Sequence, residues 1–139
     1  MTPLSLLPNS PALTVAMVGV GGTGMKGLAY LLSNKNRIIG TDVTTANLAA
    51  DANLTRTNIV SEQELAESLS ECNLLIYSDA VPATNQLRRL AQAKGIPQLC
   101  FNEVVGQLIQ DYKTIAITGT HGKSSTTAML AHIFVKNDR

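Results

Sequence analysis

Short apolar runs alternate along the chain with longer stretches in which apolar and polar positions repeat at helical spacing. The apolar runs are nearly continuous, which is typical of strands buried on both faces of a parallel sheet. The longer stretches have the length and composition of amphipathic helices. The strands are predicted at residues 14–20, 37–43, 57–60, 73–78, 96–100 and 113–118. The helices are predicted at residues 23–33, 46–53, 62–70, 83–94, 102–111 and 124–135.

Several helix boundaries carry local signals of their own. Ser61 is expected to cap the helix that follows it, and Glu64 to complete a capping box with it. Gly95 is expected to stop the helix before it, because glycine readily adopts the left-handed conformation found at helix ends. Asn102 is expected to cap the helix at residues 102–111.

The regular alternation of strand and helix predicts an α/β fold, in which βαβ units build a doubly wound parallel sheet with helices on both faces. The length of 139 residues suits one domain of ordinary size. We expect residues 1–13, which contain three prolines, to form a flexible arm. A domain boundary is expected at Asp111 and Tyr112, just before the last predicted strand.

Composition favours a packed protein of the cytoplasm and excludes several classes of partner. Hydrophobic residues make up 45% of the chain and charged residues 15%, which suits a buried core. The net charge of +1 and the 4% of aromatic residues, without tryptophan, predict no nucleic-acid partner. The first residues lack the basic start and apolar run typical of a signal peptide, and no stretch approaches the run of about 18 apolar residues that spans a membrane, so no membrane partner is expected. Cys72 and Cys100 lack metal-ligand spacing and are interpreted as buried structural thiols.

The first glycine-rich segment, Gly19-Val-Gly-Gly-Thr-Gly24, lies between a predicted strand and a predicted helix. Its glycines permit a tight turn, and the unpaired amides at the start of a helix attract a diphosphate. Asp42 ends the next predicted strand, where an acidic residue commonly binds a ribose hydroxyl. NAD and other diphosphate ligands present the same group to the same amides, so this segment alone leaves the ligand open.

A second glycine-rich segment, Gly119-Thr-His-Gly-Lys-Ser-Ser125, also lies between a predicted strand and a predicted helix. Its last residues are those of a phosphate-binding loop, in which Lys123 would reach the β- and γ-phosphates and Ser124 would ligate Mg²⁺. Ile117 stands where the full pattern has its first glycine. His121 is interpreted as a loop residue that contributes its backbone rather than an acid or a base.

Two such loops at this separation in one chain resemble the two phosphate-binding loops of the Mur ligase family. The resemblance rests on residues 19–27 and 117–127 and extends from about residue 14 to the end of the chain. It is greatest to the members that attach L-alanine, or a recycled murein peptide, to UDP-N-acetylmuramate. It implies a Rossmann-like UDP-sugar-binding domain at residues 14–111. It also implies that residues 112–139 are the strand, phosphate loop and helix that begin an ATP-binding domain.

The resemblance also implies a role for individual residues. The diphosphate of UDP-N-acetylmuramate or of UDP would be held by Gly21, Gly22, Thr23, Gly24 and Met25. Asp42 would lie near the nucleoside, and Ser78 and Ala80 would border the UDP-sugar. ATP would be bound by Gly119, Thr120, His121, Gly122, Lys123, Ser124 and Ser125. Lys123 would act on the γ-phosphate as the catalytic residue, and Ser124 would hold Mg²⁺.

By the same resemblance, the whole enzyme transfers the γ-phosphate of ATP to the carboxylate of UDP-N-acetylmuramate, and L-alanine then displaces the phosphate. Some positions depart from the family pattern: Ala16, Lys26 and Phe101 stand where members often carry a histidine, a serine and a basic residue. Residues 44–60 lack the Gly-His pattern common there. These departures leave the choice between the L-alanine branch and the murein peptide branch open.

Family members continue for hundreds of residues past the position of Arg139, and the resemblance places the other Mg²⁺ ligands, the adenine pocket and the amino-acid site there. We therefore expect this chain alone to bind a nucleotide-sugar, to hold no cofactor tightly and to catalyse no reaction. Residues 113–118 and 124–135 would lack their usual partners, and an exposed strand edge would favour self-association. A binding-only module, an NAD-dependent oxidoreductase domain and a phosphate-loop kinase are the alternatives.

Overall fold

The computed structural model describes residues 11–44, 48–110 and 113–137. The chain divides into two compact units, Met1–Leu108 and Ile109–Arg139. Residues 1–10 of the expected arm lie outside the described part, and so do Asp111 and Tyr112 of the expected domain boundary. No helix in the described ranges is both long and apolar enough to pass through a membrane.

The first unit is built on a parallel sheet of five strands in the order β3-β2-β1-β4-β5. The strands are β1 (Thr14–Val18), β2 (Arg37–Thr41), β3 (Thr57–Ile59), β4 (Leu74–Tyr77) and β5 (Gln98–Cys100). Val18 at the end of β1 pairs in register with Thr41 of β2 on one side and with Tyr77 of β4 on the other. The predicted parallel sheet is confirmed, and the carboxyl ends of its three central strands lie next to one another.

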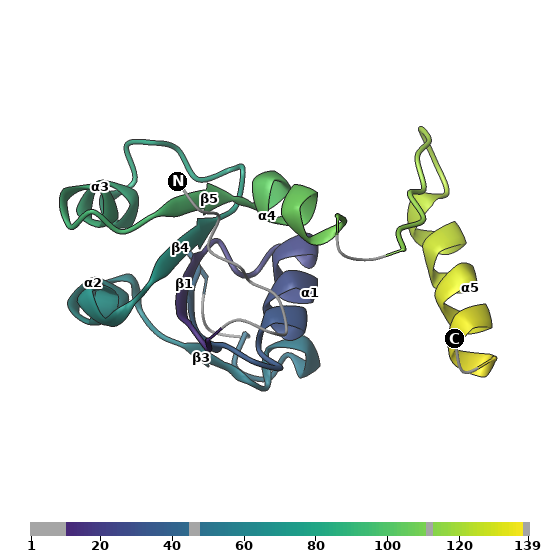
Figure 1. The fold of residues 1–139 in the computed structure, drawn as a ribbon, viewed down its shortest axis with the longest axis horizontal. Coiled ribbons are helices and arrows are strands. Elements are labelled where there is room, and N and C mark those ends of the chain that lie inside the picture. Colours follow the sequence, from purple (N-terminus) through teal and green to yellow (C-terminus); the bar gives the residue numbers. More distant parts are fainter. Residues whose placement is uncertain (1–10, 45–47, 111–112, 138–139) are drawn as a thin grey trace. The chain divides into compact units, whose positions relative to one another are not determined.

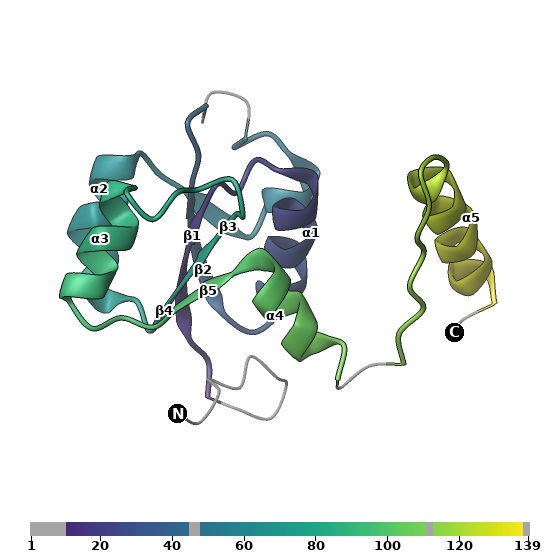
Figure 2. The same cartoon turned by 90° about the horizontal axis from the view of Figure 1, so that it is seen from above.

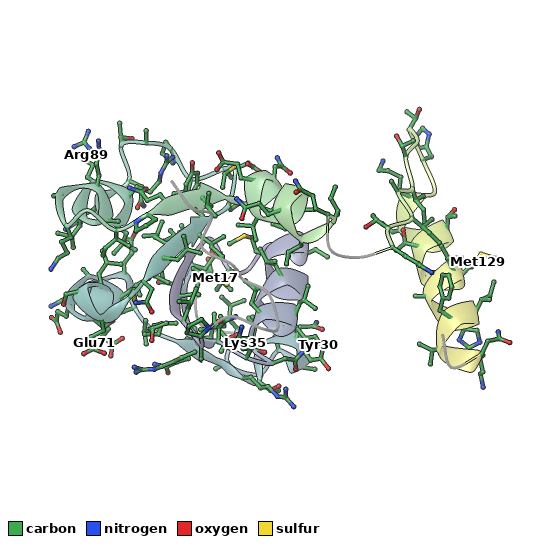
Figure 3. All side chains as sticks on the ribbon, in the orientation of Figure 1. Met17, Tyr30, Lys35, Glu71, Arg89 and Met129 are labelled. Atoms are coloured by element: carbon green, nitrogen blue, oxygen red, sulfur yellow. The ribbon has the colours of Figure 1, made fainter. Side chains whose placement is uncertain are left out.

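Two layers of helices cover the two faces of this sheet (Figures 1 and 2). Helices α1 (Thr23–Leu32) and α4 (Phe101–Leu108) cover one face, and α2 (Glu62–Ser68) and α3 (Gln86–Ala93) cover the other. Val15 and Met17 of β1 pack into the core on the α1 side, while Ala16 and Val18 pack into the core on the α2 side. Met17 lies inside the first unit in Figure 3. The strands are continuously apolar because both of their faces are buried.

The signals at both ends of the α2–α3 region are confirmed. Ser61 accepts a hydrogen bond from the Glu64 amide, and the Glu64 carboxylate accepts from the Ser61 amide, so the capping box forms as predicted. The short 3₁₀ helix η2 (Leu69–Glu71) extends α2. Gly95 has a φ of 69° and follows the end of α3, as expected of a helix-stopping glycine.

Two helices begin later in the structure than predicted, because an aspartate and an asparagine side chain cap them at later residues. The helix expected at residues 46–53 is wrong where it is described: residues 48–50 form a turn, and η1 (Ala52–Leu54) is a 3₁₀ helix capped by Asp51. Helix α3 begins later than residue 83, because the Asn85 side chain accepts from the amides of Leu87 and Arg88. Such side chains compete with a longer helix for the backbone donors.

The prediction of Asn102 as an N-cap is wrong. Helix α4 already begins at Phe101, and the Glu103 carboxylate accepts from the Cys100 amide at 2.7 Å at the start of the helix. The Asn102 side chain instead donates to the Asp79 carboxylate at 2.9 Å. Asn102 therefore links α4 to the loop that follows β4.

The second unit contains helix α5 (Lys123–Lys136), close to the helix predicted at residues 124–135. The strand predicted at residues 113–118 is wrong, because residues 113–119 have no regular structure. A strand requires a neighbour to satisfy its backbone groups, and the described residues of this unit provide none. No residue of α5 is buried, and its apolar Met129, Ile133 and Val135 are exposed.

Candidate functional site

The first glycine-rich segment lies at the point where the direction of strand addition reverses. The chain runs from β1 outward to β2 and β3 and then returns to β4 on the other side of β1. In open parallel sheets of this kind, ligands bind beyond the carboxyl ends of the strands at such a switch point. The loop between β1 and α1 occupies this position (Figure 1).

Three hydrogen bonds attach this loop to the end of β2. The amides of Gly19 and Val20 donate to the carbonyl oxygen of Thr41 at 2.9 and 3.2 Å. The Gly21 amide donates to Oδ2 of Asp42 at 2.8 Å. Gly19 has a φ of 79°, which favours glycine at the start of the turn. The end of β2 therefore fixes the path of the loop without a ligand.

The loop is also tightly packed against its neighbours. A Cβ on Gly19 would lie 2.8 Å from Cβ of Ser78, in the loop after β4. A Cβ on Gly21 would lie 2.9 Å from Oδ2 of Asp42. One on Gly24 would lie 2.8 Å from Cζ of Phe101. A side chain at any of these three positions would therefore force a neighbouring side chain to move. Phe101 thus places an aromatic ring against the start of α1.

Four consecutive amides at the start of α1 have no hydrogen-bond partner among the described residues: those of Gly22, Thr23, Gly24 and Met25. Gly22 is the N-cap and cannot cap the helix with a side chain, and no acidic residue lies in the first turn. Gly22, Thr23 and Gly24 are exposed, whereas the Met25 side chain is buried in the core. Met25 therefore has only its backbone amide to offer a ligand. The arrangement suits an anion.

The loop after β4 follows the strand that pairs with β1 on the side away from β2. Its backbone is held by the Ser78 amide, which donates to the Val18 carbonyl at 3.0 Å. The guanidinium of Arg88 donates to the Val81 carbonyl at 2.8 Å and stacks over the Tyr77 ring, 3.7 Å from the centroid. Arg88 thereby ties this loop to α3. Sequence analysis missed Arg88, since nothing in the sequence places it behind the loop.

A cavity of about 150 Å³ lies at this edge of the sheet. It brings together two predicted residues, Asp42 and Ala80, which are far apart in the sequence. The other lining residues are Val18, Gly19, Thr41, Val43, Glu62, Val81, Pro82 and Asn85. Thr41 was missed by sequence analysis, although it immediately precedes the acidic residue that was singled out.

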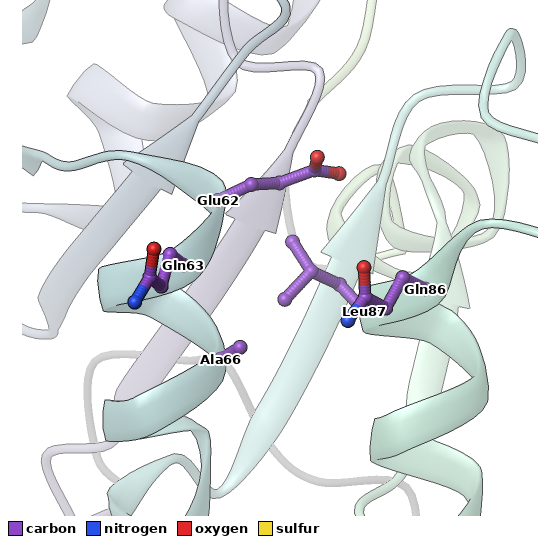
Figure 4. A pocket seen from close by; sticks show the side chains of 5 residues that line it. All are labelled: Glu62, Gln63, Ala66, Gln86 and Leu87. Atoms are coloured by element: carbon purple, nitrogen blue, oxygen red, sulfur yellow. The ribbon is translucent and has the colours of Figure 1, made fainter.

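A second hollow, of about 380 Å³, lies between α2 and α3. Figure 4 shows Glu62, Gln63 and Ala66 on one helix and Gln86 and Leu87 on the other. None of these five was predicted as a site residue. With a single carboxylate among surface amides and apolar groups, this groove has no set of groups for acid–base or nucleophilic chemistry.

Charged side chains near the first loop are already paired. Nζ of Lys26, on α1, lies 2.7 Å from Oδ2 of Asp51. The hydrogen bond from Lys26 is the main reason that the pKa of Asp51 lies below its usual value.

The two cysteines are not activated as nucleophiles. Desolvation is the main cause that raises the pKa of Cys72 and of Cys100, so both thiols are protonated at neutral pH. Neither cysteine has the lowered pKa of a nucleophile.

The second glycine-rich loop is closed by its own residues. Gly119 and Gly122 have φ values of 154° and 77°, and the ammonium of Lys123 donates to the Gly119 carbonyl at 2.7 Å. Gly122 is the N-cap of α5 and makes no side-chain cap. The amides of Lys123, Ser124 and Ser125 have no partner in the described part of the chain. This helix start also suits an anion.

The other predicted residues of the second loop are Thr120, His121, Ser124 and Ser125, and all four are exposed. No three histidine, cysteine, aspartate or glutamate side chains gather into a metal-binding group within residues 11–44, 48–110 and 113–137. The loop thus presents exposed hydroxyls and unpaired amides, and the described residues place no set of carboxylates beside them.

The family model and the related sequences that match this chain point to the same family. Residues 14–113 match the Mur ligase family, catalytic domain. A UDP-N-acetylmuramate–L-alanine ligase of Lawsonia intracellularis is 34% identical over 127 residues, covering 91% of this chain and 28% of that protein. The protein of the same description from Acetivibrio thermocellus is 30% identical over 139 residues, covering 99% of this chain and 29% of that protein.

Solved structures show the same fold. UDP-N-acetylmuramate–alanine ligase from Thermotoga maritima superposes with a TM-score of 0.76 at 27% identity, covering 88% of this chain and 29% of that one. A murein peptide ligase from Psychrobacter arcticus has the same TM-score of 0.76 at 23% identity, covering 88% of this chain and 26% of that one. The chain therefore spans between a quarter and a third of the length of these relatives.

Proposed function

Because the chain belongs to the Mur ligase family, we propose that its first unit binds UDP-N-acetylmuramate, with the diphosphate on the amides at the start of α1. The observation that carries this proposal is the set of four unpaired amides, Gly22 to Met25, at the switch point of the sheet. Unpaired amides and the helix dipole together favour a diphosphate without a neutralising side chain.

The relatives support a uridine sugar over NAD as the ligand. Both ligands offer a diphosphate to the loop, so its geometry does not separate them. The curated relatives at 30–34% identity act on UDP-N-acetylmuramate by name, with L-alanine as the second substrate. The murein peptide ligase shares the fold at 23% identity, which supports the fold but not the choice of second substrate. L-alanine is therefore the proposed amino acid, and a murein peptide is the alternative.

We propose that the second loop serves ATP in a longer protein that contains this chain. Lys123 would place its ammonium group on the γ-phosphate, and Ser124 would offer its hydroxyl to Mg²⁺. The amides of residues 123–125 would hold phosphate oxygens at the start of α5. Mg²⁺ bound there would neutralise the charge that develops in phosphoryl transfer. For these contacts, the Lys123 ammonium must turn from the Gly119 carbonyl that it now contacts at 2.7 Å.

The chain alone is proposed to form no UDP-N-acetylmuramoyl-L-alanine. The described residues supply no cluster of carboxylates for a metal. In-line phosphoryl transfer depends on such positioned charges, because the protein contributes little covalent chemistry. Detection of the amide product with this chain, ATP, Mg²⁺ and both substrates would contradict this part of the proposal.

Calorimetric titration with UDP-N-acetylmuramate, UDP, NAD and ATP in parallel tests the binding proposal. We expect UDP-N-acetylmuramate and UDP to bind through the first loop and NAD to bind more weakly than either. Tight NAD binding without a response to uridine ligands would overturn the proposal.

A pair of variants tests whether the ligand lies on the amides. Gly22 has the extended conformation of an N-cap, and its nearest neighbour for a new Cβ is 3.9 Å away, so aspartate fits there. In Gly22→Asp the new carboxylate would cap the amides and repel the diphosphate, lowering affinity about tenfold or more. Gly27→Asp adds the same charge farther along α1, where a Cβ has no neighbour within 4 Å. It should leave binding nearly unchanged, and equal losses in both variants would contradict the proposed position.

A further inference from the structure

The hydroxyl of Thr41 is buried and has no hydrogen-bond partner among the described residues. Thr41 is 1% exposed at the end of β2. Its carbonyl oxygen accepts from the amides of Gly19 and Val20, so the backbone is used by the loop while the side chain is not. Buried hydroxyls are nearly always hydrogen-bonded, because an unsatisfied one destabilises the protein. The unpaired hydroxyl of Thr41 is therefore an exception within the sheet.

The side chain of Thr41 lies on the same face of the sheet as the 150 Å³ cavity. Successive side chains of a strand alternate between faces, so Thr41 shares the face of Ile39, which packs in the core with α2 and α3. Val18, its partner in register and also a lining residue, packs in the same core. The hydroxyl is thus on the side where the cavity opens at the carboxyl end of the strand.

The other polar side chains that line this cavity already have partners in the protein. Asp42 accepts from the Gly21 amide with Oδ2. Asn85 donates to the Glu62 carboxylate at 3.1 Å, and its oxygen accepts from the amides that begin α3. Of the buried side-chain polar atoms that have no partner among the described residues, the Thr41 hydroxyl is the one that belongs to a lining residue of this cavity. It can donate and accept, so it can pair with a carbonyl, an imide or a hydroxyl.

We propose that the Thr41 hydroxyl is a specificity-determining contact, which hydrogen-bonds a polar atom in the nucleoside of the ligand. This inference rests on the proposed function, since it takes the diphosphate to lie on the amides of Gly22 to Met25. The first loop joins the two places: Gly19 lines the cavity, and Thr41 and Asp42 hold the loop that leads to Gly22. A nucleotide with its diphosphate on these amides would place its nucleoside in the cavity beside Thr41 and Asp42. The ligand satisfies the hydroxyl that the protein leaves unsatisfied.

The chain offers a matched control in Thr57. Its hydroxyl is also buried without a partner among the described residues, and the residue is 9% exposed. It pairs in register with Ile38, which packs in the core on the α1 side, so Thr57 lies on the opposite face from Thr41. It does not line the cavity. Thr57→Val therefore removes an equivalent hydroxyl without touching the proposed site.

The test compares Thr41→Val, Thr57→Val and Thr41→Ser by calorimetry with UDP-N-acetylmuramate and by thermal unfolding. We expect Thr41→Val to bind about three- to tenfold more weakly, which corresponds to one hydrogen bond. Its unfolding midpoint should stay equal or rise, because an unsatisfied buried hydroxyl has been removed. Thr57→Val and Thr41→Ser should bind like the parent chain. Thr41→Ser keeps the test valid if valine disturbs folding.

Competition by inorganic pyrophosphate isolates the nucleoside contact. Pyrophosphate has the diphosphate without a nucleoside, so Thr41→Val and the parent chain should bind it equally. Equal affinity of Thr41→Val and the parent chain for the nucleotide-sugar, with binding that remains sensitive to Gly22→Asp, would overturn the role of Thr41 and leave the proposed function standing. No binding of the nucleotide-sugar by the parent chain would overturn the proposed function, and the role of Thr41 with it.

Discussion

The two glycine-rich loops of the chain have similar local patterns and different structural support. The loop before α1 is held by three hydrogen bonds to the end of β2 and packs against Ser78 and Phe101. The loop before α5 is closed by its own lysine, which donates to the Gly119 carbonyl. Residues 113–119 before it form no strand, and α5 buries none of its residues. A glycine pattern can specify the turn and the helix start, whereas the strand before it requires neighbours.

The helices of the chain also differ in how their first amides are capped. Helices α2 and α3 begin with side-chain caps from Ser61 and Asn85, which satisfy amides within the protein. Helices α1 and α5 begin at Gly22 and Gly122, which offer no side-chain cap. Amides that a protein caps serve its stability, while exposed and uncapped amides at a glycine-rich loop are open to an anion.

The largest difference in the free energy of unfolding is expected between two alanine substitutions, one of an apolar residue in each unit. Leu75 of β4 is 0% exposed, and Leu75→Ala should lower the free energy of unfolding by about 2–5 kcal/mol. Met129 of α5 is 69% exposed, and Met129→Ala should change it by less than about 0.5 kcal/mol. Urea unfolding followed by circular dichroism measures both, as the chain has no tryptophan. A large loss in Met129→Ala would show that α5 is packed in solution.

A smaller effect is expected from the arginine that holds the loop after β4. Arg88→Ala removes the hydrogen bond to Val81 and the stacking on Tyr77. It should destabilise the first unit by about 1–2 kcal/mol and speed hydrogen exchange in residues 78–82. Arg89, the exposed next residue, provides the control, and Arg89→Ala should change neither quantity. Similar losses in the two variants would mean that Arg88 acts through α3 alone.

The anchor of the first loop should have an effect of about one hydrogen bond. Asp42→Ala removes the acceptor for the Gly21 amide and should weaken UDP-N-acetylmuramate binding about three- to tenfold. Asp42→Asn keeps an oxygen for that amide, so hydrogen exchange of Gly21 should be as slow as in the parent chain and faster in Asp42→Ala. If Asp42→Ala also leaves this exchange unchanged, the carboxylate does not order the loop.

The smallest effect concerns the capped helix α2 and its pH dependence. The hydrogen bonds from Ser61 hold the pKa of Glu64 below its usual value. A carboxyl group with a lowered pKa in the folded state contributes stability above its unfolded pKa, and this is lost as the pH falls through the folded pKa. Ser61→Ala should therefore destabilise the chain more at pH 7 than at a pH below the folded-state pKa of Glu64, where the carboxyl group is protonated in both states. Equal destabilisation at both values would exclude the charged capping box.

Much of the first unit could be predicted from sequence because its signals are local and consistent. The apolar runs fixed β1, β2 and β4 to within a few residues, and Ser61 with Glu64 marked the start of α2 correctly. The first loop was predicted because its glycines follow a strand and precede a helix. These features need only neighbouring residues to be recognised.

The errors occurred where distant residues decide the outcome. Asn102 has the composition of a cap, but it bonds Asp79 across the loop instead. Residues 113–118 are apolar enough for a strand, yet no partner strand exists for them among the described residues. Arg88 was missed because its contact depends on how α3 packs behind the loop after β4. Thr41 was missed because its place beside the cavity depends on several elements that are distant in the sequence.

The most direct measurement of the central claim is the amide spectrum of the ¹⁵N-labelled chain during titration with UDP-N-acetylmuramate. The largest shifts are predicted for Gly22, Thr23, Gly24 and Met25, because a diphosphate would accept hydrogen bonds from these amides. The amides of Lys123, Ser124 and Ser125 should shift much less with this ligand. Saturable binding that leaves residues 22–25 unshifted would contradict the account, whatever other residues respond.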